Sequence, residues 1–208
     1  MNRRYVFAAV AAACALATMP TAAVEPPKDA SATARQLVRW ATENGDHQGL
    51  PFAVIDKPAA RIHVFSAQGQ WLGSSPVLLG AALGDRSAPD IGQRPLSQIR
   101  PEERTTPAGR FVTEPGRNLR GEDIVWIDYE SAVSLHRVRS VRASERRHQR
   151  LRSQGVGDKR ISYGCVNAPE GFYNQFIAPL FGQSPGVVYV LPDTEDFATI
   201  FEAASTYP

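Results

Sequence analysis

Apolar and polar residues alternate in several short stretches between residues 50 and 191, and this period of two is typical of β-strands. Turns that contain Gly or Pro separate the stretches. Strands are predicted at 52–56, 61–65, 71–80, 123–129, 133–138 and 186–191, and residues 106–112 are predicted as a turn that leads into a further strand. The 123–129 and 133–138 segments are close enough in sequence to pair as a hairpin. In the second of these, Val133 and Leu135 share one face, so Ser134 and His136 point to the other.

Three further stretches have helical spacing. Residues 32–44 and 170–180 each place apolar side chains on one face, and residues 143–153 are predicted as a highly charged helix. The apolar positions are Ala34, Leu37, Val38 and Ala41 in the first helix, and Phe172, Phe176 and Ile177 in the second. A short helix is also predicted at the C-terminus. Residues 81–105 are polar and Pro-rich, and their length favours a functional loop or flap. The fold class predicted is therefore mostly β with peripheral helices.

The first 23 residues have the composition of a secretory signal peptide. Arg3 and Arg4 precede an apolar run at residues 5–18, and small residues follow at 21–23. The run is too short to span a bilayer. Cys14 lies inside it, but the preceding residues lack the Leu of a lipid-attachment signal, so lipidation is not favoured. The domains predicted are a signal peptide (1–23), a leader with one helix (24–50) and a catalytic domain (51–208).

Removal of residues 1–23 changes both the charge and the cysteine content. The full chain has 23 basic and 21 acidic residues, and loss of Arg3 and Arg4 leaves 21 of each. Cys165 is then the one remaining cysteine. A single thiol in an exported protein cannot form an internal disulfide, so it is either buried and inert or reactive.

Cys165 follows Ser162, Tyr163 and Gly164, and this pattern favours the reactive alternative. Glycine allows the backbone to approach a substrate closely. Pro169 excludes helical angles at the residue before it, so Cys165 is predicted at a strand–loop–helix corner. Such a corner presents the thiol together with backbone N–H groups.

A cysteine nucleophile requires a base or a positive environment, because the thiolate is the reactive species. Of the four histidines, His47 lies in a polar connection and His148 in a basic stretch, and His63 is interpreted as a surface or hydrogen-bonded residue. His136, near the end of a strand, is the remaining candidate. Sequence separation alone does not establish that it contacts Cys165.

The residues Ser162–Tyr163–Gly164–Cys165–Val166, preceded by His136 and by Thr106–Pro107–Ala108–Gly109–Arg110–Phe111, resemble the YkuD-type L,D-transpeptidase catalytic domain. The resemblance covers about residues 51–191. It implies a β-sandwich-like fold, a cysteine acyl-enzyme, and peptidoglycan stem peptides as substrate. It also implies that carbapenem-type inhibitors can act as donor mimics.

The resemblance implies a role for each matching residue. Cys165 is the nucleophile and His136 the base, oriented by a backbone carbonyl. The N–H groups of Gly164 and Cys165, with Tyr163 as a further candidate, stabilise the oxyanion. Ser162 shapes the loop by hydrogen bonding.

Two positions depart from the family pattern. The family motif usually ends in Arg where this chain has Asn167, and the position of Tyr163 is often His. Arg160, or an arginine of the stretch after His136, is therefore predicted to meet substrate charge, with Asn167 bracing the loop or contacting substrate. Residues 137–160, here named the basic segment, contain nine Arg or Lys and two acids. This segment is either a solvated helix or a lid that attracts peptidoglycan carboxylates.

The sequence thus predicts an exported L,D-transpeptidase of the periplasm or cell envelope. It predicts no metal or cofactor, no membrane span and no nucleic-acid partner, because no ligand cluster or phosphate-binding loop is present in the sequence. Two alternatives stay open. One is a peptidoglycan-peptide hydrolase with the same Cys–His pair, and the other is a non-catalytic cell-wall binding protein.

Overall fold

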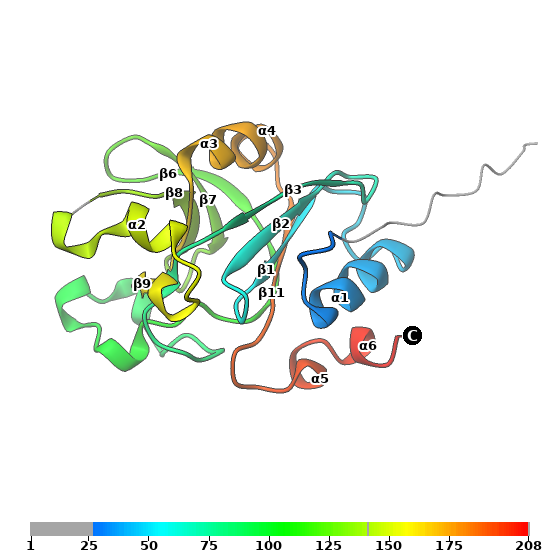
Figure 1. Cartoon of the computed structure of the whole chain (residues 1–208), viewed down its shortest axis with the longest axis horizontal. Coiled ribbons are helices and arrows are strands. Elements are labelled where there is room, and N and C mark those ends of the chain that lie inside the picture. Colours follow the sequence, from blue (N-terminus) through cyan, green and yellow to red (C-terminus); the bar gives the residue numbers. More distant parts are fainter. Residues whose placement is uncertain (1–26, 141, 208) are drawn as a thin grey trace, which may run out of the picture.

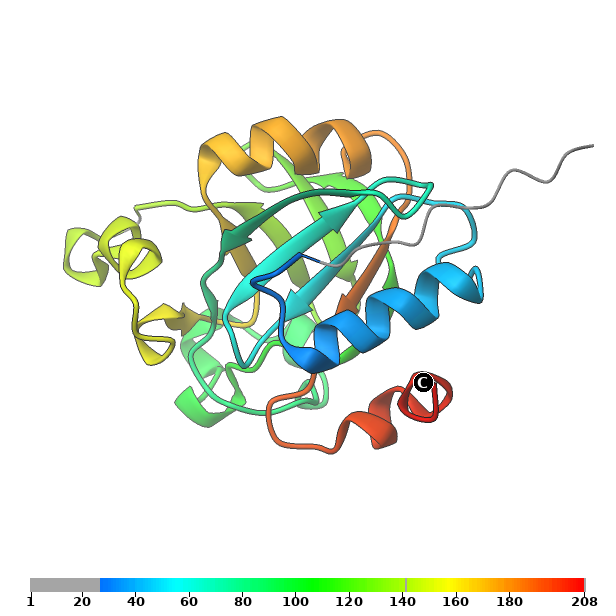
Figure 2. The same cartoon turned by 45° about the vertical axis from the view of Figure 1, so that its right-hand side comes forward.

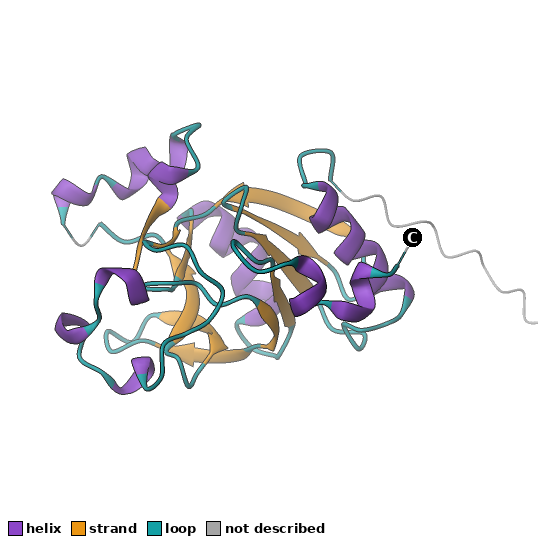
Figure 3. Cartoon of the chain, turned by 90° about the horizontal axis from the view of Figure 1, so that it is seen from below, coloured by secondary structure: helices purple, strands orange, loops and turns teal. Residues whose placement is uncertain are grey.

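The computed structural model describes residues 27–140 and 142–207, so the predicted signal peptide and Cys14 lie outside the described residues. Strands occupy the centre and helices lie around them (Figure 3). The strands are β1 (Phe52–Asp56), β2 (Arg61–Phe65), β3 (Trp71–Pro76), β4 (Leu79–Gly80), β5 (Gly109–Val112), β6 (Glu114–Arg117), β7 (Asp123–Asp128), β8 (Val133–Arg137), β9 (Arg160–Ser162), β10 (Val166–Ala168) and β11 (Val187–Val190). The prediction of a mostly β fold with peripheral helices is confirmed.

Two sheets pack face to face. One has the order β3-β2-β1-β11-β5 and the other β10-β8-β7-β6, while β4 and β9 form a small parallel pair. A single buried cluster joins the sheets, with Ile55 and Val190 from the first and Val125 and Leu135 from the second. The predicted hairpin of β7 and β8 is confirmed, and both strands are internal to their sheet.

Helices cover the outer face of the five-stranded sheet. Helix α1 (Ala32–Glu43) begins at Ser31, whose side chain accepts the N–H of Ala34, and buries the four apolar residues expected from its spacing. It packs beside α5 (Phe197–Ile200) and α6 (Glu202–Ser205) on one side of the molecule (Figure 2). Because both faces of β1 are covered, every residue of this strand is buried, which explains its continuous apolar run.

The predicted helix at 170–180 is present, but it changes pitch. It consists of α3 (Glu170–Phe172), a π-helical turn (Tyr173–Ile177) and α4 (Ala178–Phe181). The prediction that Phe172, Phe176 and Ile177 share the buried face is only partly right. Tyr173, Ile177 and Phe181 are fully buried, whereas Phe172 and Phe176 are partly buried.

The basic segment does not form the single helix expected at 143–153. It contains a 3₁₀ turn (Ala143–Glu145), α2 (Arg147–Arg152) and a second 3₁₀ turn (Gly157–Lys159), because Arg146 has a left-handed backbone (φ 49°) that interrupts the helix. These pieces and β9 lie at the end of the molecule opposite α1 and α6 (Figure 1). Within the described part of the chain, no helix is both long and apolar enough to cross a membrane.

Candidate active site

Parallel pairing of β8 with β10 assembles the residues predicted for catalysis. Asn167 lies opposite His136 in this pair, and Val166 lies opposite Leu135. Since side chains alternate along a strand, Cys165 and Asn167 project to the same face as Ser134 and His136. Val133, Leu135 and Val166 project into the core instead. The alternation that separates Ser134 and His136 from the core was visible in the sequence, but their strand partner was not.

Cys165 precedes β10 directly, so the corner is strand–loop–strand, and the predicted helix begins only after Pro169. The half-buried thiol lies 3.6 Å from the hydroxyl of Ser134 and 3.6 Å from the carbonyl oxygen of Ala132. Burial raises the pKa of Cys165, but the nearby His136 and Ser134 outweigh it, so the pKa is lowered. Ser134 was not among the predicted site residues.

His136 is held in one tautomer by its own strand. Its Nδ1 lies 2.7 Å from the carbonyl oxygen of Arg137, and because a carbonyl can only accept, Nδ1 carries the proton. The Nε2 atom is therefore the unprotonated nitrogen of the ring. Its lone pair accepts a hydrogen bond from the side-chain amide of Asn167 at 3.3 Å, and this is the position that a proton from the thiol would take.

Asn167 is fully buried and connects three parts of the site. Its amide nitrogen contacts His136 and donates to the carbonyl oxygen of Cys165 at 3.2 Å. Its side-chain oxygen accepts from Arg147 at 2.6 Å. A guanidinium only donates, so Arg147 fixes the orientation of the amide. Arg147 is held in turn by Glu145, at 2.6 Å, which ties the basic segment to the site.

The hydroxyl of Ser162 holds the backbone of the loop that carries Cys165. It accepts the N–H of Gly164 at 3.1 Å and donates to the carbonyl oxygen of Cys165 at 2.6 Å. The Gly164 N–H, expected to face an oxyanion, is therefore already in use. The N–H of Cys165 has no hydrogen-bond partner in residues 27–140 and 142–207. Gly164 itself has φ +136°, and a Cβ there would lie 2.8 Å from the carbonyl oxygen of Thr105.

Two predicted site residues face other partners. The ring of Tyr163 is covered by Arg104, whose guanidinium carbon lies 4.2 Å from the ring centre, so it anchors the 81–105 loop. Arg160 is nearly buried and pairs with Asp193 at 2.5 and 3.0 Å. Its contact with substrate stays a prediction, and the structure gives the guanidinium a structural partner.

A cleft of about 280 Å³ lies over the thiol. Its walls include Cys165, His136 and Ser134, together with residues from the β6–β7 turn, β7, the β7–β8 turn and the basic segment: Asn118, Arg120, Glu122, Ile124, Trp126, Ala132, Arg139 and Arg147. Arg139 pairs with Glu122 at 2.9 Å. The exposed guanidinium of Arg120 has no ion-pair or hydrogen-bond partner in the part of the chain described.

A second cavity, of about 760 Å³, adjoins the cleft. The two share Trp126 and Ala132, and the second cavity extends along residues 87–93 and 129–131. Its charged residues are Asp90 and Glu130, both exposed. Cys165 thus lies beside one cavity rich in arginine and near another that is acidic.

The remaining histidines lie outside the cleft. His47 contacts Leu50 in the outer core, His63 is buried against Ser74 at 2.7 Å, and His148 is exposed. Burial lowers the pKa of His63, which favours its neutral form. Among the described residues, no group of three or more His, Cys, Asp or Glu side chains is arranged to hold a metal ion.

Together, Ser134, His136 and the N–H of Cys165 can activate a thiol, accept its proton and hydrogen-bond an oxyanion.

Solved structures similar to this chain include an L,D-transpeptidase in complex with imipenem (TM-score 0.40, 19% identity, covering 67% of this chain and 58% of that one). Another is an L,D-transpeptidase from Mycobacterium smegmatis (TM-score 0.35, 16% identity, covering 67% of this chain and 58% of that one). A third is the catalytic domain of an E. faecium L,D-transpeptidase (TM-score 0.38, 17% identity, covering 69% of this chain and 98% of that one). This chain spans about three fifths of the length of the first two. No protein-family model and no curated protein matches it.

Proposed function

We propose that this chain is an exported L,D-transpeptidase of the cell envelope, which acts on peptidoglycan stem peptides through a Cys165 acyl-enzyme. The observation that carries the proposal is the grouping of Cys165, Ser134 and His136 in one cleft, with the pKa of the thiol lowered. An inert structural cysteine needs none of these neighbours. The motif around Cys165 directs the proposal to peptidoglycan.

In the acylation step, the thiol proton passes to Nε2 of His136 and the sulfur attacks the carbonyl of the L-centre of a diamino acid in a stem tetrapeptide. The N–H of Cys165 stabilises the negative oxygen of the tetrahedral intermediate. The C–N bond to the terminal D-Ala then breaks, and His136 returns the proton to the leaving amine. A thioester on Cys165 remains.

In the second step, an acceptor amine gives a proton to His136 and attacks the thioester carbonyl. An amide bond forms, and the sulfur leaves as thiolate. Water in place of the amine gives hydrolysis instead. Transfer and hydrolysis therefore differ in which nucleophile reaches the thioester, and the cleft at Cys165 and the cavity that adjoins it bear on that choice.

The charges of the two cavities suit the two substrates. Arg120 in the cleft has a free guanidinium that can bind a carboxylate of the donor peptide. From the sequence alone, this binding of substrate charge is predicted for Arg160. Asp90 and Glu130 in the acidic cavity favour an acceptor that carries an ammonium group. We therefore place the donor in the arginine-rich cleft and the acceptor in the acidic cavity.

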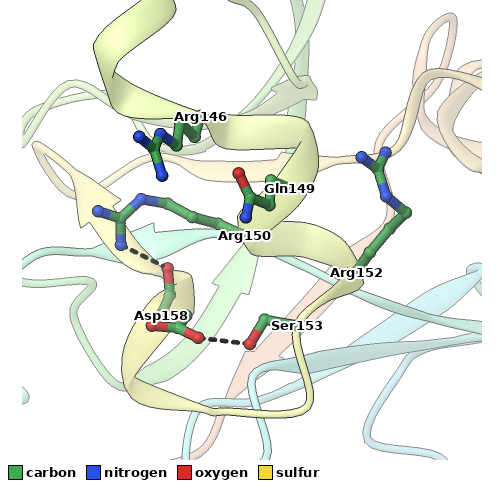
Figure 4. Close-up of a pocket in the computed structure, with 6 residues that line it drawn as sticks. All are labelled: Arg146, Gln149, Arg150, Arg152, Ser153 and Asp158. Atoms are coloured by element: carbon green, nitrogen blue, oxygen red, sulfur yellow. Dashed lines mark hydrogen bonds between the residues drawn. The ribbon is translucent and has the colours of Figure 1, made fainter.

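The basic segment supplies a third feature. Arg146, Arg150 and Arg152 surround a pocket of about 440 Å³ on its outer side (Figure 4). Arg150 is held by the carbonyl oxygen of Asp158 at 2.9 Å, and Asp158 is held by Ser153. Arg146 and Arg152 are exposed and available to anionic groups of the wall polymer. The two exposed arginines support the predicted attraction of peptidoglycan carboxylates to this segment, while Arg147 donates to Asn167 in the site.

Incubation with purified disaccharide-tetrapeptides, followed by mass spectrometry, tests the proposal. Cross-linked dimers with loss of D-Ala are expected, and Cys165→Ala should form none. Shortened monomers alone would indicate the hydrolase, and unchanged tetrapeptide would indicate a binding protein. Asp90→Asn with Glu130→Gln should shift products from dimers toward shortened monomers, because only the acceptor side is altered. Labelling of Cys165 by a carbapenem is expected as well.

A further inference from the structure

Thr106 lies where three segments of the site meet. It is fully buried, and it belongs to the Thr106–Phe111 turn that accompanies the cysteine motif in the sequence. Its hydroxyl accepts the N–H of Gly80 at 2.9 Å and donates to the carbonyl oxygen of Gly164 at 2.8 Å. One side chain therefore connects β4 to the loop that carries the nucleophile.

Within the described residues, two backbone donors beside the thiol have no hydrogen-bond partner, the N–H groups of Tyr163 and Cys165. The Gly164 N–H binds Ser162, the Gly164 carbonyl binds Thr106, and the Cys165 carbonyl accepts from Ser162 and Asn167. Of these two donors, the N–H of Cys165 belongs to the same peptide as the Gly164 carbonyl that Thr106 binds, and it is free to bind a ligand. A substrate oxygen would supply its missing partner.

We infer that Thr106 is the positioning residue that aims the N–H of Cys165 at the developing oxyanion. The inference rests on the proposed acyl transfer. The Gly164–Cys165 peptide is trans, so its C=O and N–H point in opposite directions. By holding the C=O on the inner side, the Thr106 hydroxyl turns the N–H outward, on the side of the thiol and the cleft.

The backbone of Thr106 is itself held by a hydrogen bond from a buried lysine. Lys57, which is fully buried, donates to the carbonyl oxygen of Thr106 at 2.7 Å and also pairs with Asp85 at 2.7 Å. On the other side, Gly164 approaches Thr105 so closely that a Cβ would not fit. The hydroxyl therefore has little freedom to move, and the peptide it holds has little freedom to rotate. A donor fixed in advance stabilises an oxyanion more than a mobile one does.

Two reagents separate this role from a general effect on the thiol. Acylation by 4-nitrophenyl acetate forms a thioester and releases 4-nitrophenolate through a tetrahedral oxyanion. Alkylation by iodoacetamide displaces iodide directly and forms no oxyanion. Both require the thiolate, so the ratio of the two rates reports the N–H donor alone.

Thr106→Val removes the hydroxyl and keeps the shape of the side chain. We expect its acylation rate to fall by roughly 10- to 100-fold, less than the roughly 100- to 1,000-fold lost when an oxyanion donor is deleted. Alkylation should stay at the wild-type rate. Thr106→Ser keeps the hydroxyl and should restore acylation. If circular dichroism shows that Thr106→Val is unfolded, Thr106→Ala gives the same comparison with a cavity in place of a methyl group.

An unchanged acylation rate in the folded valine or alanine variant would overturn the inference. So would an equal loss of acylation and alkylation, because that pattern indicates damage to the thiol or to the loop. The proposed function is judged separately, by wild-type protein and muropeptides. If the wild type forms no product from muropeptides but the rate ratio still depends on the Thr106 hydroxyl, the function fails and the positioning role stands.

Discussion

The pKa of the Cys165 thiol depends on its burial and on two neighbouring side chains, His136 and Ser134. Burial favours the neutral thiol, whereas His136 and Ser134 favour the thiolate, and together the latter two prevail. The balance depends on His136 being in the tautomer that Arg137 imposes through its carbonyl. The site therefore depends on a backbone atom as well as on side chains.

The pH dependence of alkylation tests this balance. The iodoacetamide rate should have its midpoint below the value of about 8.5 for a free cysteine. In His136→Ala the midpoint should rise, because two effects that lower the pKa are lost and burial remains. Acylation should also slow by roughly 10²- to 10⁴-fold. An identical profile in the variant would show that the imidazole does not act on the thiol.

Asn167 is expected to act mainly as a brace for the loop. Asn167→Ala leaves the Cys165 carbonyl with one partner fewer and leaves Arg147 facing a cavity. Loss of a buried hydrogen-bond partner costs about 1–3 kcal/mol, so the melting temperature and the acylation rate should fall together. Thermal denaturation and intact-mass kinetics measure the two effects. Lower substrate affinity at an unchanged melting temperature would instead assign Asn167 to substrate binding.

Replacing Arg120 should change KM, whereas replacing Arg160 should change the stability of the fold. Arg120→Gln should raise KM for stem peptides, more at low salt than at high salt, with little change in the melting temperature. Arg160→Ala leaves the nearly buried Asp193 without one cationic partner, so it should destabilise the fold. Steady-state kinetics and melting curves on both variants check this. A raised KM with unchanged stability in Arg160→Ala would restore the earlier assignment of Arg160 to substrate.

Among the elements, strongly patterned segments could be predicted from sequence and the shortest paired ones could not. α1, β1, β2 and β11 match their predicted ranges closely, because burial imposes helical spacing on α1 and apolar runs or alternation on the three strands. β4, β9 and β10 have two or three residues each, too few to show any period. β6 contains Pro and Gly, which usually indicate a turn.

The same limit applies to the site. Cys165 and His136 could be named from the motif, but their position in one cleft depends on the parallel register of β8 and β10, which short strands do not reveal. The role of Ser134 follows from that register, whereas the role of Arg147 depends on the position of α2 beside Asn167. The partner of Arg160 lies 33 residues away in sequence, and no local pattern indicates it.

The basic segment should affect substrate capture and leave the chemistry unchanged. Arg146→Gln with Arg152→Gln removes two exposed guanidinium groups, while Arg147 and Arg150, which have structural partners, are kept. Binding to peptidoglycan sacculi should weaken, and the difference should shrink as salt rises. A control with the same change of charge, Lys28→Gln with Arg39→Gln, lies outside this segment. Equal binding by the two double variants would make the segment a plain solvated surface.

On the scale of the whole molecule, the buried pair of Lys57 and Asp85 joins distant segments. Asp85 accepts from Lys57 and from the backbone N–H groups of residues 193, 194 and 195, at 2.6 to 2.8 Å. The pair links the 81–105 loop to the segment after β11 and, through Lys57, to Thr106. Burial raises the pKa of Asp85, but these hydrogen bonds outweigh it and hold the pKa well below its usual range.

Asp85→Asn should lower the stability of the whole fold. It leaves Lys57 with only one carboxylate, Asp193, at 3.4 Å. Removal of one partner from a buried pair costs about 3–5 kcal/mol. Because folding lowers the pKa of Asp85, its stabilising effect is complete above about pH 4 and is lost as the pH falls toward the folded value. Melting curves at pH 7 and pH 3 should differ less in Asp85→Asn than in the wild type, with Glu102→Gln as an exposed control. Equal acid sensitivity would contradict this.

The position of β11 has a consequence for the order in which the protein folds. This strand is among the last elements along the chain, yet it lies between β1 and β5, pairing in parallel with the first strand. Until residues 187–190 arrive, the five-stranded sheet is split into two parts with unpaired inner edges. Contacts between such distant residues form slowly. In a nascent chain, the five-stranded sheet can therefore be completed only after residues 187–190 have been made, when nearly all of the protein has been synthesised.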